Sequence, residues 1–132
     1  MLKPGICNEV VFSVGPDQTA AAVGSGTLEV LASPVLFAFL EKAAWTAASP
    51  FLEEGSSTVG TLLNVQHISP TPVGLEVTCR AELISVQERS LRFQLTASDP
   101  SGPIASGIHE RVIIQNDRFL SKANRKQSPN KG

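Results

Sequence analysis

The pattern of apolar and polar residues along the chain predicts one buried helix. From Pro34 to Ala48 nearly every residue is apolar, and a helix that is apolar almost all round is usually a buried one. The polar exceptions are Glu41, Lys42 and Thr46. Serine is a favoured N-cap and proline suits the first helical turn, so Ser33 is predicted to cap this helix. Ser49-Pro50 is predicted to end it.

Strands are predicted on both sides of this helix. Ile6 to Val14 is rich in β-formers and predicts the first strand, whereas Thr19 to Val23 is either a short strand or a loop. Four further β-segments follow the helix, separated by turn signals: Thr58 to Ser69, Val73 to Leu83, Leu91 to Ala97 and Ile104 to Gln115. Two of them alternate between apolar and polar residues, as strands with one buried face do. The alternation slips at Leu83-Ile84, which indicates a β-bulge.

This order of strand, buried helix and four tightly connected strands predicts an α+β architecture. Tight turns join antiparallel strands, whereas parallel strands need a long crossover. The single apolar helix is therefore expected on one face of a curved antiparallel sheet of about five strands. We expect one domain over residues 1–132, with a mobile polar tail from about residue 120.

Composition places the chain among globular proteins and narrows the classes of function. The chain has 132 residues, of which 42% are hydrophobic and 17% are charged, with a formal net charge of −1. That length allows one core, and the charge balance lacks the basic stripe of a nucleic-acid-binding protein. The longest apolar run is too short and too polar to span a membrane. We therefore expect neither a nucleic acid nor a membrane as partner.

The cysteines and the N-terminal residues suggest a reducing compartment. Cys7 and Cys79 make neither a disulfide framework nor the ligand cluster of a metal site. The first residues lack the long apolar run of a signal peptide. We expect a cytoplasmic protein without a bound metal ion.

Glu41 is the most informative polar residue because it lies in the middle of the apolar helix. Phe37 and Trp45 stand four residues to either side and share its helix face. A carboxylate in such surroundings is costly to bury unless it is paired or serves a function. The alternative is that Glu41 faces solvent beside Lys42, and the pattern leaves both interpretations open.

Four other residues are candidates for binding or chemistry. Ser33 stands at a helix start, where N–H groups stabilise negative charge, although a plain N-cap looks the same in sequence. His67 stands at one of the alternating positions of its strand that are otherwise apolar, which suits either a proton carrier or an ordinary core histidine. Gly60 marks a bulge or a close approach of backbone or ligand. Arg111 could bind a phosphate or carboxylate, or could lie on a wet strand face.

Together these residues resemble the fluoroacetyl-CoA thioesterase-like branch of the hotdog superfamily. The similar stretches are LASPVLFAFLEKAAW, TVGTLLNVQHISPTPVG and SGIHERVII, within a resemblance that runs from about Val10 to Phe119. Their order and spacing agree without a gap between Ser33 and Arg111. The resemblance implies a hotdog fold and an acyl-CoA thioesterase that acts as a homodimer or a tetramer. It implies no cofactor, since coenzyme A is part of the substrate.

The resemblance also implies which residues form the site. The family's threonine, glutamate and histidine correspond to Ser33, Glu41 and His67, where serine keeps the hydroxyl group. Its substrate-contacting glycine and arginine correspond to Gly60 and Arg111. In that family the two active sites lie at the dimer interface.

The implied reaction is hydrolysis of a small or medium acyl-CoA thioester to the free acid and coenzyme A. The thioester carbonyl is expected near Ser33 and Gly60, and Glu41 would either activate water or attack the carbonyl itself. The segment that shapes acyl specificity in the family is small here, Ala22 to Thr27, so fluoroacetate specificity is not implied. The alternatives are a non-catalytic acyl-CoA-binding hotdog module and a hotdog hydratase or dehydratase.

Overall fold

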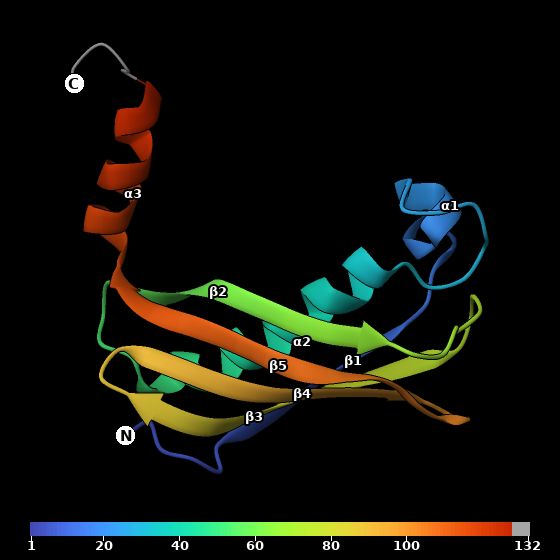
Figure 1. Cartoon of the computed structure of the whole chain (residues 1–132), viewed down its shortest axis with the longest axis horizontal. Helices are drawn as coiled ribbons and strands as arrows, with labels where there is room; N and C mark the ends of the chain where they lie inside the picture. The colour runs from blue at the N-terminus through green and yellow to red at the C-terminus, as the bar shows by residue number, and fades with distance from the viewer. Residues whose placement is uncertain (128–132) are drawn as a thin grey trace.

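In the computed structural model, a five-stranded antiparallel sheet curves around one long helix (Figure 1). The structure describes residues 1–127. The strands are β1 (Cys7–Ser13), β2 (Ser56–His67), β3 (Glu76–Gln87), β4 (Ser90–Asp99) and β5 (Gly102–Gln115), in the spatial order β1-β3-β4-β5-β2. The helices are α1 (Ala20–Val23), α2 (Ser33–Ala48) and α3 (Asn116–Asn124), with 3-10 turns η1 (Pro16–Gln18), η2 (Ser49–Phe51) and η3 (Arg125–Gln127). The predicted α+β architecture is confirmed.

The core lies between α2 and the face of the sheet that covers it. Leu36 and Leu40 of α2 are fully buried, and the alanines of the same helix face let the backbone approach the strands closely. The strand residues opposite belong to the predicted alternation: Val77, Cys79, Ala81, Leu83, Leu91, Phe93, Leu95 and Ala97. Their burial confirms that β3 and β4 each have one buried and one wet face. Val73, where the first of these strands was predicted to begin, is exposed and precedes β3.

The start of α2 differs from the prediction. Ala32 occupies the N-cap position and Ser33 is the first helical residue, with Pro34 in the first turn. The predicted capping role of Ser33 is therefore wrong. The segment expected as a strand or loop before it contains α1, which begins after Thr19 because the threonine hydroxyl accepts a hydrogen bond from the Ala22 N–H.

Three register shifts interrupt the strand pairing, one of them between Ala97 and Ser98 in the β4–β5 pair. The shift between Leu83 and Ser85 in the β3–β4 pair confirms the predicted bulge. A second shift lies between Gly60 and Leu62 in the β2–β5 pair. Because β2 is an edge strand, this second bulge shapes the unpaired edge of the sheet.

The C-terminal segment is helical where the structure describes it. The expected polar tail from about residue 120 overlaps α3 and η3, and α3 projects away from the sheet in Figure 1. Residues 128–132 of that tail lie outside the described residues. Between residues 1 and 127, no helix has the length and apolar character that crossing a membrane requires.

Candidate active site

The start of α2 and the end of β2 bring Ser33 and His67 together. The Ser33 Oγ lies 2.7 Å from the His67 Nδ1. Since Ser33 is the first helical residue, its hydroxyl does not cap the backbone and is free to face the strand. The unpaired N–H groups of the first helical turn lie beside this pair and favour negative charge.

Burial favours the neutral form of the His67 imidazole, which is the form that can act as a base. Desolvation lowers the pKa of His67, and a contact with the Ser69 backbone raises it by a smaller amount. The Nε2 atom is buried and has no hydrogen-bond partner among the described residues. Because the Ser33 hydroxyl can donate or accept, its contact with Nδ1 suits either tautomer, and Nδ1 can either accept the Ser33 proton or return it.

A cavity of about 330 Å³ opens beside this pair. Its lining comes from the α1 region, the start of α2 and the end of β2: Ala20, Ser25, Val30, Leu31, Ser33, His67, Ile68, Ser69 and Pro70. The cavity has room for a small acyl group, and its walls come in part from the segment expected to shape acyl specificity.

Glu41 lies in a second cluster with Arg111 and His109. The Arg111 Nη1 is 3.4 Å from the Glu41 Oε2, and the His109 Nε2 is 3.8 Å from the same oxygen. Arg111 also donates from Nε to the Thr58 Oγ1 and from Nη2 to the Thr58 carbonyl, both at 2.8 Å. The Glu41 side chain is 40% exposed, so one flank of the carboxylate is paired and the other is open to solvent.

Gly60 is required by the close packing of this cluster. A Cβ atom at Gly60 would lie 2.9 Å from the Glu41 Oε2 and 3.2 Å from the His109 Cε1. A side chain there would displace the carboxylate. The bulge predicted at Gly60 is confirmed, whereas the groups that approach Gly60 in the chain are side chains rather than backbone.

Arg111 does not lie on a wet strand face, so that interpretation is wrong. The residue is only 7% exposed, and burial lowers its pKa although Glu41 raises it. Its donors point to Glu41 and Thr58 rather than outward, which does not favour binding of a phosphate group in solvent. A second cavity of about 330 Å³ is lined in part by Arg111 and Trp45.

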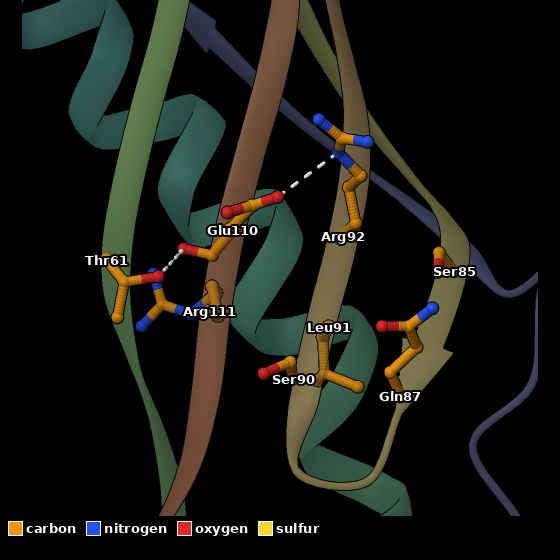
Figure 2. A pocket seen from close by; sticks show the side chains of 8 residues that line it. All are labelled: Thr61, Ser85, Gln87, Ser90, Leu91, Arg92, Glu110 and Arg111. Carbon is orange, nitrogen blue, oxygen red and sulfur yellow. Dashed lines mark hydrogen bonds and ion pairs between the residues drawn. The ribbon is translucent and has the colours of Figure 1, made fainter.

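The alternation of β5 places Glu110 on the opposite face of the sheet. Figure 2 shows Glu110 and Arg92 paired on that face, at an N–O distance of 3.2 Å, around a polar cavity of about 290 Å³. The Thr61 hydroxyl donates to the Glu110 carbonyl there, at 3.2 Å. Glu110 is therefore a surface carboxylate, while its two neighbours in sequence are buried.

Within one chain the five predicted site residues form two separate groups. Ser33 and Glu41 are eight residues apart, which is about 12 Å along a helix. Gly60 and His67 are seven residues apart, which is about 23 Å along a strand. The expectation that one carbonyl lies near both Ser33 and Gly60 is therefore wrong for a single chain.

Sequence reasoning missed two members of the second group, His109 and Thr58. The signal for His109 is its spacing from Arg111, because residues two apart in a strand share a face. Thr58 likewise stands two residues from Gly60 in β2. No cluster of three or more potential metal ligands of the His, Cys, Asp or Glu type occurs within residues 1–127.

Comparisons with known proteins identify the family and the fold of this chain. The sequence profile of the fluoroacetyl-CoA-specific thioesterases matches residues 14–117. A fluoroacetyl-CoA thioesterase of Streptantibioticus cattleyicolor is 40% identical over 98 residues, which cover 74% of this chain and 70% of that protein. A solved structure of the fluoroacetyl-CoA thioesterase FlK superposes with a TM-score of 0.91 at 33% identity, over 96% of this chain and 98% of that one. A hot-dog-like protein from Thermanaerovibrio acidaminovorans, 22% identical, superposes with a TM-score of 0.86 over 95% of this chain and 93% of its own, and shows the fold alone.

Proposed function

This chain belongs to the fluoroacetyl-CoA-specific thioesterase family, has the hotdog fold and is an acyl-CoA thioester hydrolase, and from that premise we propose that Ser33, Glu41 and His67 carry the reaction. The observation that carries this proposal is the 2.7 Å contact between the Ser33 hydroxyl and the His67 imidazole at a helix start. A hydroxyl beside a neutral imidazole is the arrangement that nucleophilic and general-base catalysis require.

The proposed mechanism assigns a separate task to each group. The thioester carbonyl binds at the start of α2, where N–H donors stabilise the oxyanion by about 3 kcal/mol for each donor. Glu41 activates a water molecule or attacks the carbonyl to form an anhydride. If Glu41 activates water, the proton that it removes passes through the neutral His67, coupled to Ser33, to the coenzyme A thiolate released as the C–S bond breaks. If Glu41 attacks, the thiolate leaves as the anhydride forms; water then hydrolyses the anhydride, which frees Glu41, and His67 passes the proton of that water to the thiolate.

Completion of the site requires a second chain in this proposal. The edge strand β2 exposes its centre, residues 60–64, including Leu62 at 43% and Leu63 at 38%. If two copies of β2 paired antiparallel about an axis midway between Gly60 and His67, the Glu41 cluster of one chain would face the Ser33–His67 pair of the other. The separation of the two groups within one chain and the exposed edge both support a homodimer, which could pair again into a tetramer.

The substrate is proposed to be a small or medium acyl-CoA. The acyl group would occupy the cavity beside Ser33 and His67, whose α1 wall is built of small residues. Gly60 and Arg111 would border the substrate from the opposite chain. We expect no separate cofactor, because coenzyme A enters as part of the substrate. A cytoplasmic location, which suits that substrate, is part of the same proposal.

Free-thiol release from a panel of acyl-CoA esters tests the proposal. Wild type should release coenzyme A, and Glu41→Gln should lose turnover by at least 10²-fold with an unchanged fold, because the amide neither attacks nor accepts a proton. Glu110→Gln is the matched control, since that carboxylate lies on the outer face and should leave the rate near wild type.

Other outcomes would redirect the assignment. A Glu41→Gln variant with near-wild-type kcat would remove Glu41 from the reaction. Saturable binding of every ester without thiol release would indicate the non-catalytic module, and water addition to an enoyl-CoA without thiol release would indicate the hydratase.

A further inference from the structure

His109 is a fully buried polar residue to which the proposed reaction assigns no task. We propose that His109 is a positioning residue that holds the Arg111 guanidinium from behind and, through Arg111, fixes the Glu41 carboxylate over Gly60. The inference deepens the proposed function, because it presupposes that Glu41 acts in the reaction.

The two hydrogen bonds of the ring determine its tautomer. The His109 Nδ1 lies 2.8 Å from the Leu62 carbonyl oxygen, which can only accept, so Nδ1 carries the proton. The His109 Nε2 lies 3.0 Å from the Arg111 Nη1, which can only donate, so Nε2 must present its lone pair. The neutral Nδ1–H form satisfies both contacts. In the protonated ring, the Nε2–H donor would face the Arg111 Nη1–H donor, and no hydrogen bond could form between them.

The guanidinium of Arg111 depends on this acceptor. Nε and Nη2 are held by Thr58. Among residues 1–127, the hydrogen-bond partners of Nη1 are the His109 Nε2 at 3.0 Å and the Glu41 Oε2 at 3.4 Å. The shorter of the two contacts is to the imidazole. Without it, Nη1 would keep one long contact to a half-exposed carboxylate, and the angle between Arg111 and Glu41 would be free to change.

The surroundings of the ring favour the neutral form. It is faced by the Arg111 cation from its own strand, the Glu41 carboxylate from α2, the Leu62 carbonyl from β2 and the Phe93 ring from β4. Desolvation lowers the pKa of His109 most, and Arg111 lowers it further, against opposing effects of Leu62 and Glu41. A leucine would fill the same space, so packing alone does not call for a histidine here.

A pair of amide variants separates positioning from packing. In His109→Gln, the longer side chain can place its carbonyl oxygen near the former Nε2 and accept from Arg111, whereas the shorter His109→Asn reaches only the Leu62 carbonyl. We expect His109→Asn to lower kcat roughly tenfold or more with little change in KM, as loss of a hydrogen bond to a charged group implies. His109→Gln should recover most of that kcat at a similar melting temperature. Equal kcat in the two variants would overturn the proposal.

A measurement that does not depend on activity tests the tautomer directly. The chain has two histidines, so ¹⁵N shifts of the imidazole nitrogens are assigned by comparison with His67→Asn. We expect His109 to show the Nδ1–H tautomer and to stay neutral below pH 6.5, the ordinary histidine value. An Nε2–H or charged ring at neutral pH would refute the positioning role even in an active enzyme. If no acyl-CoA is hydrolysed but this tautomer is found, the proposed function fails and the geometry stands.

Discussion

The chemistry available to Ser33 depends on where the helix begins. A serine at the N-cap would use its hydroxyl to accept a backbone N–H from the first turn. Because Ala32 takes the N-cap position, the Ser33 hydroxyl turns to His67 instead. A shift of one residue therefore converts a structural hydroxyl into one coupled to a half-buried imidazole.

In the proposed mechanism, the pH dependence of the reaction follows from His67. Its pKa lies below 6.5, so the ring is neutral and can act as a base at pH 7 and above. We expect kcat/KM to be constant above pH 6.5 and to fall as the pH drops through the lowered value, because the protonated ring cannot accept a proton.

Two variants show which histidine causes this fall in kcat/KM at low pH, the acid limb of the pH profile. His109→Gln removes the other histidine and should keep the limb, whereas His67→Asn should lose both the limb and most of the rate. An acid limb that persists unchanged in His67→Asn would belong to a different group.

At the scale of elements, the pairing of β2 with β5 positions the second cluster. The bulge between Gly60 and Leu62 sets the Leu62 carbonyl against His109, and the pleat of β5 directs His109 and Arg111 to the same face. Gly107 lies opposite Val65 farther along this pair. A Cβ at Gly107 would overlap the Asn64 carbonyl oxygen and lie 2.6 Å from the Val65 Cα.

Gly107→Ala should therefore separate β2 from β5. Neither partner of the clash is a flexible side chain, so the backbone must move, and we expect a loss of about 2 kcal/mol or more in the free energy of unfolding. Chemical denaturation measures it. Gly15→Ala is the control, because a Cβ there meets only the side chains of Asp17 and Gln18. Equal stability of the two variants would contradict the packing argument.

At the scale of the whole molecule, the proposed site is divided between the start and the middle of α2. Ser33 and His67 lie at its start, and Glu41 lies two turns later beside Arg111. The edge of β2 between them is exposed and apolar at its centre. In the proposed two-fold dimer, the Ser33–His67 pair of each chain would lie opposite the Glu41 cluster of the other chain.

Mixed dimers test this arrangement. Ser33→Ala and Glu41→Gln homodimers should each be almost inactive. A mixed dimer would contain one site with both native residues, so an equal, exchanging mixture should recover about a quarter of the wild-type rate. Purified through a different tag on each chain, the mixed dimer should be active. Absence of recovery in a verified mixed dimer would place Ser33 and Glu41 of one chain in the same site.

Local pattern was sufficient to predict the buried helix, the alternating strands β3 and β4 and the bulge near Leu83, because each depends on residues close in sequence. The motif spacing identified Ser33, Glu41 and His67 as candidates and, through a resemblance, the family. The short helix α1 was missed because its cap is the side chain of Thr19, in a segment whose composition also suits a strand.

Only the tertiary structure decided how the candidates are grouped. Whether Arg111 faces water or Glu41 depends on how β5 registers against β2, and a strand's two faces differ only once its partners are in place. The same register buries His109 and sets the Leu62 carbonyl beside it. The sequence thus determined which elements form and which residues can react, while long-range pairing determined which of them meet, because contacts across a sheet join residues with no relation in local pattern.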